Sequence, residues 1–259
     1  LELNKNWNTA RRALLRSPLD RMGFGGYLSL ADKFPKFISR VGDICNEFRQ
    51  IHDVCYGKKP YSVATVAILN AWGEKRSWMA HMVAHELWYQ QVYSYQGVYE
   101  ALSGLPVNVK FLSFEDIREK GIPDDVDVLL NVGDRDTAYS GGENWKDPLI
   151  QEKVREFVAK GKGFIGVGEP TSYLEEGRLF TLSDVLGVDE EVSLTLSEDK
   201  YNIEKKKHFI TEDVISEVDY GEGKKNIYAL DGTDVLDIRF SPRFERKVNV
   251  GEVLMAANS

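Results

Sequence analysis

A glycine-rich stretch near the amino terminus contains residue types that can bind an anion. In the segment LDRMGFGGYLSL, Gly23, Gly25 and Gly26 fall within four positions and are flanked by Arg21 and Tyr27. Arginine presents a fixed fork of donors that matches phosphate oxygens. Glycines let backbone N–H groups come close to an anion. The spacing is not that of a dinucleotide-binding fingerprint and no strand precedes it, so a tight turn is the alternative interpretation.

Polar and aromatic side chains also follow three of the predicted strands. In open α/β sheets, ligands bind outside the carboxyl ends of the strands. We therefore expect the loops at residues 70–78, 133–145 and 168–178 to meet at one edge, the alternative being a solvated loop edge. The side chains that we expect at this edge are Arg76, Trp78, Asp134, Arg135, Asp136, Tyr139, Ser140, Glu169 and Tyr173.

One of these loops begins with the strand and turn GFIGVGEP. This segment resembles the nucleophile elbow of class I glutamine amidotransferases, in which a cysteine lies between glycines. Gly168 occupies the position of that cysteine, and no His-x-Glu pair follows late in the chain. We therefore predict that the amidotransferase-like fold is kept without an activated nucleophile.

Two histidines, His81 and His85, lie four residues apart in a predicted helix. That spacing can place two imidazoles on one metal ion. The order is not that of an HExxH motif and no third ligand is evident, so we favour packing roles and predict no metal site. Neither a Ser-His-Asp arrangement nor a phosphate-binding P-loop can be assembled from the sequence.

An α/β framework would position these loops. Runs rich in apolar residues, which are typical of strands buried on both faces, occupy residues 63–69, 109–112, 126–132 and 164–167. Helical periodicity or helix-start signals mark residues 34–56, 79–102 and 147–160. The alternation predicts a doubly wound, mostly parallel sheet with helices on both faces.

The pattern changes past about residue 190, where short apolar runs alternate with charged turns. We expect strands at residues 192–196, 209–210, 227–230, 235–240 and 248–256. Residues 191–259 are therefore predicted to be β-rich and partly outside the α/β core.

The composition restricts the function classes. Of 259 residues, 42% are hydrophobic and 29% charged, as in ordinary globular proteins. The net charge of −8 argues against a general nucleic-acid surface. No apolar run is long enough to span a bilayer, and residues 1–20 are too polar for a signal peptide. Cys45 and Cys55 lie about 15 Å apart along one predicted helix, so we expect buried free thiols, as suits the cytoplasm.

Longer segments carry a resemblance to a known family. They are LRSPLDRMGFGGYLSL, LNAWGEKRSWMAHMV, YQGVYEALSGLPVNVKFLSFEDI, GFIGVGEP and GEGKKNIYALDGT. These segments resemble the 1,3-β-galactosyl-N-acetylhexosamine phosphorylases of glycoside hydrolase family 112, that is, the galacto-N-biose/lacto-N-biose phosphorylases. The resemblance covers nearly the whole chain and fades after about Asp234.

The resemblance implies three regions. Residues 1–35 would be the carboxyl-terminal end of a (β/α)8 barrel, residues 36–190 a central amidotransferase-like α/β domain, and residues 191–259 a β-rich extension. Since the chain begins without Met and stops within a strand-like pattern, we expect a piece of a longer protein.

The resemblance also implies a reaction. Such enzymes reversibly cleave β-1,3-galactosides with inorganic phosphate, giving α-galactose 1-phosphate and N-acetylhexosamine with inversion. Phosphate is itself the nucleophile, so only a carboxylic acid that protonates the leaving oxygen is needed. That acid would belong to the missing part of the barrel, and we assign no catalytic residue and no cofactor to this chain. Phosphate or substrate would contact Arg21, Gly23, Gly25, Gly26, Tyr27, Arg76, Trp78, Asp134, Tyr139 and Glu169.

Two alternatives remain open. The α/β domain could be a non-catalytic module that serves dimerisation, like the comparable domain of β-galactosidases. A related family with the same architecture cleaves galactosyl-rhamnose, and the residues do not separate the two substrates. In each case we expect small-molecule substrates, a homodimer, and no nucleic-acid or membrane partner.

Overall fold

A computed structural model describes residues 2–16, 19, 21, 27–71, 90–135, 140–175, 178–192, 204–221, 226–242 and 249–259. The chain divides into two compact units. The first comprises Leu1–Val63 and Gln96–Asn108, and the second comprises Ala64–Tyr95 and Val109–Ser259. Each unit has its own hydrophobic core.

The first unit is helical. It contains α1 (Glu2–Arg16), α2 (Leu28–Ala31), α3 (Pro35–Cys55) and the end of α5 (Gln90–Ser103). Proline at the first position of α3 suits a helix start, because its missing N–H would have no partner there. Leu14 of α1 packs with Ile44 and Phe48 of α3. This core places α3 with α1, whereas the resemblance had implied that residues 36–190 belong to the central domain.

Two arginines of α1 link it to the other helices of the first unit through an ion pair and hydrogen bonds. Arg11 forms a two-pronged ion pair with Glu47 of α3, and this hydrogen bonding holds the pKa of the Glu47 carboxyl below its ordinary value. Arg16 donates to four backbone carbonyls at and beyond the end of α5, including Ser103 O at 3.1 Å and Val107 O at 2.8 Å. These carbonyls have no partner within the helix, so Arg16 caps α5.

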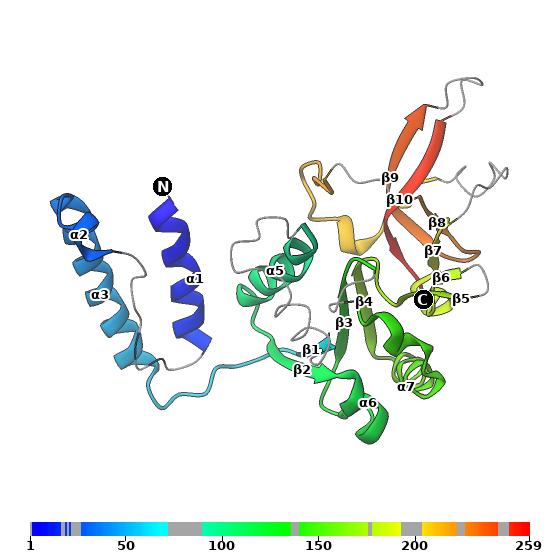
Figure 1. Ribbon diagram of the computed structural model, residues 1–259, viewed down its shortest axis with the longest axis horizontal. Coiled ribbons are helices and arrows are strands. Elements are labelled where there is room, and N and C mark those ends of the chain that lie inside the picture. Colours follow the sequence, from blue (N-terminus) through cyan, green and yellow to red (C-terminus); the bar gives the residue numbers. More distant parts are fainter. Residues whose placement is uncertain are drawn as a thin grey trace. The chain divides into compact units, whose positions relative to one another are not determined.

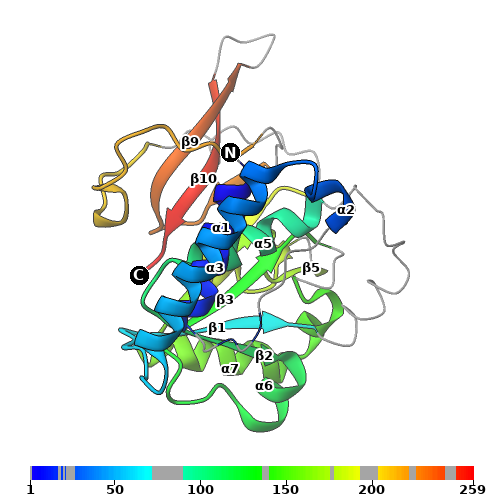
Figure 2. The same ribbon diagram turned by 90° about the vertical axis from the view of Figure 1, so that its left-hand side faces the viewer.

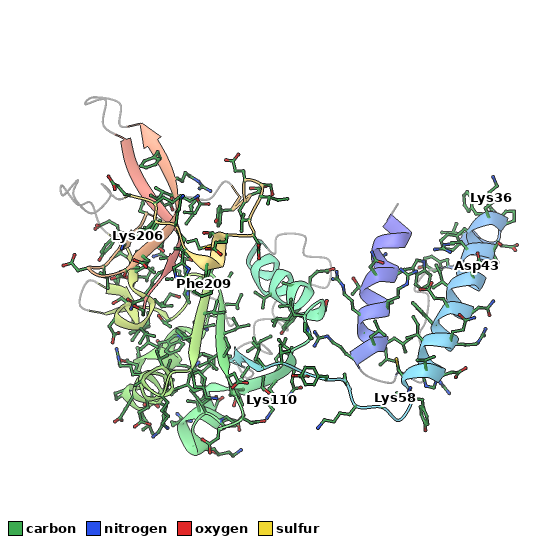
Figure 3. All side chains as sticks on the ribbon, turned by 180° about the vertical axis from the view of Figure 1, so that it is seen from behind. Lys36, Asp43, Lys58, Lys110, Lys206 and Phe209 are labelled. Carbon is green, nitrogen blue, oxygen red and sulfur yellow. The ribbon has the colours of Figure 1, made fainter. Side chains whose placement is uncertain are left out.

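The two cysteines correct one expectation. Both lie on α3 and are free, but Cys45 is exposed and Cys55 only half-buried. The buried stripe of α3 runs through Ile44 and Phe48. Since each residue turns a helix by about 100°, Cys45 lies well away from that stripe. Charged side chains such as Lys36 and Asp43 also extend from α3 (Figure 3).

A four-stranded sheet forms the centre of the second unit. Its strands are β1 (Thr65–Asn70), β2 (Asn108–Ser113), β3 (Val128–Gly133) and β4 (Gly163–Gly168), in the order β2-β1-β3-β4 (Figure 1). The pairs β1–β3 and β3–β4 are parallel, which confirms the predicted parallel sheet. Consecutive residues of β1 and β3 are buried, so both faces of the central strands are covered.

Two helices cover one face of this sheet. They are α6 (Phe114–Lys120) and α7 (Pro148–Ala159), which is preceded by the 3₁₀ helix η1 (Gly142–Lys146). Their apolar residues share a core with alternate residues of the strands, including Leu69 and Leu129. Asp147 caps α7 by accepting a hydrogen bond from the Leu149 N–H at 3.0 Å, as the Asp-Pro signal predicted. Of the helix predicted at residues 79–102, residues 79–89 lie outside the described residues.

Hairpins and short elements complete the second unit. They are β5 (Ser172–Glu175), β6 (Arg178–Phe180), α8 (Ser183–Leu186), β7 (Val188–Glu190), η3 (Phe209–Thr211), β8 (Ile227–Ala229), β9 (Asp234–Pro242) and β10 (Asn249–Ala257). The pairs β5–β6, β7–β8 and β9–β10 are antiparallel. The ladder between β9 and β10 is seen in both views (Figure 2). The predicted β-rich character past residue 190 is confirmed.

Two local predictions for the second unit were wrong. Residues 168–178, read as a loop, contain β5 and the start of β6. Residues 209–210, predicted as a strand, belong to η3. The side chain of His208 accepts a hydrogen bond from the Ile210 N–H at 3.2 Å, and such side-chain bonding competes with strand pairing. Residues 193–196 of another predicted strand lie outside the described part of the chain.

Within the described residues, no helix combines the length and apolar character that crossing a bilayer requires.

Candidate functional site at the carboxyl edge of the sheet

Two of the three predicted loops meet at the carboxyl edge of the sheet. The parallel register pairs Gly133 with Gly168, so Asp134 and Glu169 both follow the strand ends at this edge. The Glu169 N–H donates to the Gly133 carbonyl at 2.8 Å. The structure therefore brings the start of loop 133–145 beside the start of loop 168–178.

Glu169 is the buried carboxylate of this edge. Its side chain is 2% exposed, and its Oε2 accepts a hydrogen bond from the Arg135 N–H at 2.9 Å. The half-exposed Arg135 guanidinium lies 3.9 Å from the other carboxylate oxygen. A buried carboxylate needs such donors, because an uncompensated charge away from water is costly. Of this pair, the guanidinium is the group that a polar ligand can contact, because the carboxylate is buried.

Gly168 contributes no side chain to the site, and none fits. Its φ is +83°, in the left-handed region that favours glycine. A Cβ added there would lie 2.8 Å from the Gly133 carbonyl oxygen and 3.1 Å from its carbon. Both atoms belong to the backbone, so they cannot rotate away. A cysteine at this position would therefore require movement of β3 or β4.

Asn131 holds the two loops in place from inside β3. Its Oδ1 accepts a hydrogen bond from the Thr171 N–H at 2.6 Å, and its Nδ2 donates to the Ser140 carbonyl at 3.0 Å. The same carbonyl accepts a hydrogen bond from the Trp145 indole at 2.6 Å. Asn131, Ser140 and Thr171 are fully buried. This network sets the direction in which both loops leave the sheet.

Sequence reasoning missed Asn131 and Thr171. The signal for Asn131 was a single amide in the apolar run VLLNVG, where a buried polar group must find partners. Thr171 has φ 54°, which is unusual for a β-branched residue, and its sequence context gave no sign of it. Neither residue is placed to react with a ligand, so both act by positioning the loops.

The remaining predicted residues fall elsewhere. Arg21 and Tyr27 belong to the first unit and are exposed, with Tyr27 at 79%. The Tyr27 carbonyl accepts the Leu30 N–H at 2.9 Å at the start of α2. Tyr173 lies in β5 and is half-buried, with the Lys146 ammonium 4.9 Å from the centre of its ring. The other predicted residues lie outside the described part of the chain, namely Gly23, Gly25, Gly26, Arg76, Trp78, His81, His85, Asp136 and Tyr139.

Family models match almost the whole chain. Residues 1–63 match the model described as the lacto-N-biose phosphorylase N-terminal TIM barrel domain. Residues 65–252 match the model described as the lacto-N-biose phosphorylase central domain. The two matches meet where the two compact units divide, at residues 63 and 64, whereas the resemblance had implied a boundary near residue 35.

Curated relatives agree with these matches. A protein of Lachnoclostridium phytofermentans named 1,3-beta-galactosyl-N-acetylhexosamine phosphorylase is 52% identical over 91% of this chain and 33% of its own length. One of the same name from Bifidobacterium longum is 55% identical over 81% of this chain and 28% of its own. A D-galactosyl-beta-1->4-L-rhamnose phosphorylase of L. phytofermentans is 38% identical over 90% of this chain and 31% of its own. The chain thus spans about a third of the length of these relatives.

Proposed function

Because the chain belongs to the lacto-N-biose phosphorylase family, we propose that the whole protein is an inverting disaccharide phosphorylase. It cleaves β-1,3-galactosyl-N-acetylhexosamine reversibly with inorganic phosphate, giving α-galactose 1-phosphate and N-acetylhexosamine. The observation that carries this proposal is the 52–55% identity to relatives of that name. The named galactosyl-rhamnose phosphorylase is more distant, at 38%, which favours the β-1,3-linked substrate.

The proposed chemistry needs few protein groups. The phosphate oxygen attacks the anomeric carbon as the glycosidic bond breaks, and one carboxylic acid protonates the leaving oxygen. No base has to activate a water molecule, since phosphate is already a nucleophile. We place the acid in the part of the barrel that precedes this chain, and the reaction requires no cofactor.

We propose that Arg21 and the loop Gly23 to Tyr27 hold the phosphate. The segment lies within the barrel match, and barrel enzymes commonly bind phosphate with loops at the carboxyl-terminal face. Arg21 is exposed in the first unit, so its guanidinium can reach a ligand. We further propose that Arg76, Trp78, Asp134, Tyr139 and Glu169 complete the substrate site from the central domain.

We propose an amidotransferase-like origin for the central domain, with its nucleophile lost. The strand order β2-β1-β3-β4 and the left-handed turn at Gly168 support this relationship. Glutamine hydrolysis should be undetectable, because no nucleophilic side chain fits at position 168. Release of ammonia from glutamine by the purified full-length protein would contradict this.

Incubation of the full-length protein with galacto-N-biose or lacto-N-biose tests the main proposal. We expect turnover only when inorganic phosphate is present. ¹H and ³¹P NMR should identify the sugar phosphate as the α anomer. Release of free galactose without phosphate would instead indicate a hydrolase, and faster cleavage of galactosyl-rhamnose would reassign the substrate. We also propose a homodimer in the cytoplasm, which gel filtration and cell fractionation can examine.

A further inference from the structure

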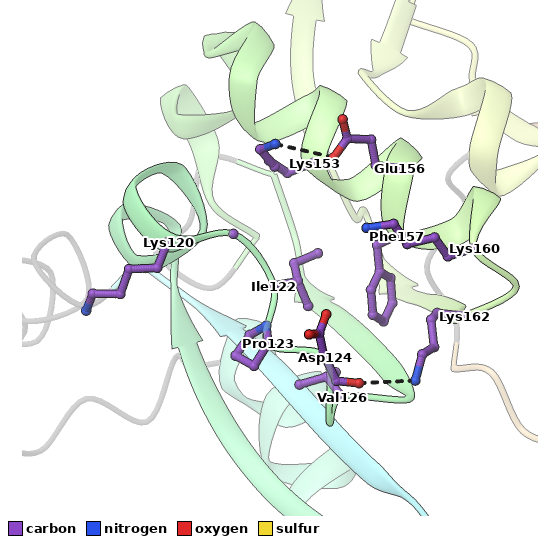
Figure 4. A pocket seen from close by; sticks show the side chains of 11 residues that line it. Lys120, Ile122, Pro123, Asp124, Val126, Lys153, Glu156, Phe157, Lys160 and Lys162 are labelled. Atoms are coloured by element: carbon purple, nitrogen blue, oxygen red, sulfur yellow. Dashed lines mark hydrogen bonds and ion pairs between the residues drawn. The ribbon is translucent and has the colours of Figure 1, made fainter.

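A pocket of ≈240 Å³ opens at the amino edge of the sheet, opposite the edge that holds Glu169 (Figure 4). One wall is the segment between α6 and β3, and the other is the second half of α7 with the turn into β4. The two edges are separated by the length of β3, roughly 17 Å for six residues. The pocket is therefore distinct from the site at the carboxyl edge.

Four lysines line this pocket in a protein whose net charge is −8. Lys120 and Lys160 lie at the carboxyl ends of α6 and α7, where a cation is favoured by the helix dipole. That reason does not extend to Lys153, inside α7, or to Lys162, which precedes β4. The concentration of ammonium groups thus exceeds what the helix ends require.

The ammonium groups are only partly neutralised. Lys162 lies 2.9 Å from an Asp127 carboxylate oxygen, and Lys153 lies 3.3 Å from Glu156. Lys120 extends away from the pocket (Figure 4) and lies 2.9 Å from an Asp116 carboxylate oxygen. All three are surface ion pairs, which contribute little and exchange readily with solvent or ligand. Across the part of the chain that the structure describes, no carboxylate lies within ion-pair distance of Lys160. The lining contains two carboxylates, Asp124 and Glu156, against the four lysines.

The pocket has an apolar floor beneath this charged rim. Phe157 is 6% exposed and Val126 fully buried, and Ile122 lies beside them. Figure 4 shows the Asp124 carboxylate between Phe157 and Pro123. Apolar surface, clustered cations and acceptor-only carboxylates thus line a single pocket.

We propose that this pocket binds a sugar phosphate. The phosphate would accept charge-assisted hydrogen bonds from Lys160 and its neighbouring lysines. Sugar hydroxyls, which donate hydrogen bonds, would bind the Asp124 and Glu156 carboxylates. The C–H face of the ring would cover Phe157 and Ile122. A plain anion would gain nothing from the carboxylates, and an uncharged sugar would bring no negative charge to the lysines. This assignment goes beyond the proposed reaction and does not depend on it.

Titration of the ¹⁵N-labelled protein with α-galactose 1-phosphate, galactose and inorganic phosphate tests the proposal. We expect α-galactose 1-phosphate to shift the amide signals of Gly121 and Lys160 and to bind more tightly than the other two. Lys160→Ala should weaken its binding about tenfold, as for loss of one charge-assisted hydrogen bond at an exposed site. Lys205→Ala, which alters an exposed ion-paired lysine outside the pocket, is the matched control and should change nothing.

A second variant separates the sugar contribution from simple anion binding. Asp124→Asn should weaken binding of α-galactose 1-phosphate and leave inorganic phosphate unaffected or bound more tightly, since a repelling charge is removed. Both substituted residues are exposed, so the fold should persist, which circular dichroism can check. Tighter binding of both ligands by Asp124→Asn would overturn the proposal, as would unchanged amide signals at the pocket.

Arg21→Ala distinguishes this pocket from the proposed phosphate site. If α-galactose 1-phosphate binding is lost in Arg21→Ala but retained in Lys160→Ala, the ligand occupies the glycine loop and the pocket proposal is wrong. The proposed function would survive that result. If α-galactose 1-phosphate binding is lost in Lys160→Ala but retained in Arg21→Ala, the result supports the pocket proposal, whatever the outcome of the phosphorolysis assay.

Discussion

The side chain of Asn131 and the backbone of Thr171 are joined by a buried hydrogen bond of 2.6 Å, although the residues are forty positions apart. Thr171 is held there at φ 54°. The same Asn131 amide donates to the Ser140 carbonyl. One side chain therefore satisfies a donor from one loop and an acceptor from the other. The shape of the carboxyl edge depends on an amide, since only an amide offers both groups at this size.

Asn131→Ala should lower the free energy of unfolding by about 2–4 kcal/mol. The substitution removes the acceptor of the buried Thr171 N–H and one of the donors to the buried Ser140 carbonyl. Urea denaturation followed by tryptophan fluorescence measures the change. Asn108→Ala, on an exposed position of β2, is the control and should stay within about 0.5 kcal/mol. Equal stability of the two variants would show that the loops are held by other contacts.

Comparing the stabilities of Gly168→Ala and Gly161→Ala separates the cost of a left-handed backbone from the cost of a steric clash. Their φ values are +83° and +82°, but a Cβ at Gly161 meets nothing within 4 Å, while one at Gly168 meets the backbone of Gly133. Gly161→Ala should cost about 1–2 kcal/mol from the left-handed conformation alone. Gly168→Ala should cost clearly more, as measured by thermal or urea unfolding. Similar losses in both variants would mean that β3 and β4 can separate easily.

Asp184→Asn should reduce stability only above acidic pH. Hydrogen bonds from Arg155, at 2.8 and 3.0 Å, are the main cause that lowers the pKa of the Asp184 carboxyl. A depressed folded-state pKa contributes stability above the unfolded value of about 3.9, and this is lost as pH falls through the folded value. Because both side chains are partly exposed, we expect less than about 1 kcal/mol.

Urea titrations of the wild type and Asp184→Asn at several pH values between 7 and 2 measure this difference. It should shrink towards zero below about pH 4. Asp213→Asn, which changes an exposed carboxyl elsewhere in the chain, is the control. A difference that persists unchanged at pH 2 would assign the effect to packing rather than charge.

Arg21→Ala should raise the apparent KM for phosphate far more than that for the disaccharide in the full-length enzyme. Loss of a bidentate charge-assisted contact costs about 2–3 kcal/mol, or some thirty- to a hundredfold. Steady-state kinetics with each substrate varied in turn measure the two constants. Arg40→Ala, an exposed arginine of α3, is the matched control. If a folded Arg21→Ala enzyme has an unchanged KM for phosphate, the glycine loop is a turn without a role in phosphate binding.

The sequence predicted the secondary structure correctly where the local pattern of apolar residues corresponds to burial in the folded protein. The aliphatic runs that became β1 and β3 are buried on both faces, so their residue types reflect the sheet directly, whereas Ile165 of β4 is half exposed. The start of α7 was readable from Asp147-Pro148, because capping is a short-range interaction. Order along the chain likewise sufficed to place Asp134 and Glu169 at one edge, since parallel strands all end on the same side.

Other features depend on partners that are distant in sequence. β5 and β6 form a hairpin in a segment rich in turn residues, and η3 replaces a strand because His208 bonds the local backbone. Cysteine is a residue type that is often buried, but Cys45 is exposed and faces away from the buried stripe of α3 through Ile44. Asn131 could be noticed as an unusual residue, but its two partners could not be named from spacing.

The amino-acid sequence by itself determined the parallel α/β framework, the family, and the absence of a nucleophile at Gly168, because these follow from residue type and order. Only the tertiary structure showed that no side chain could return to position 168, since the Gly133 carbonyl that excludes it is brought there by strand pairing. The lysine-lined pocket likewise exists only once α6, α7 and two strands have packed. Close approach of distant backbone and clustering of charge arise from folding, so residue order alone does not reveal them.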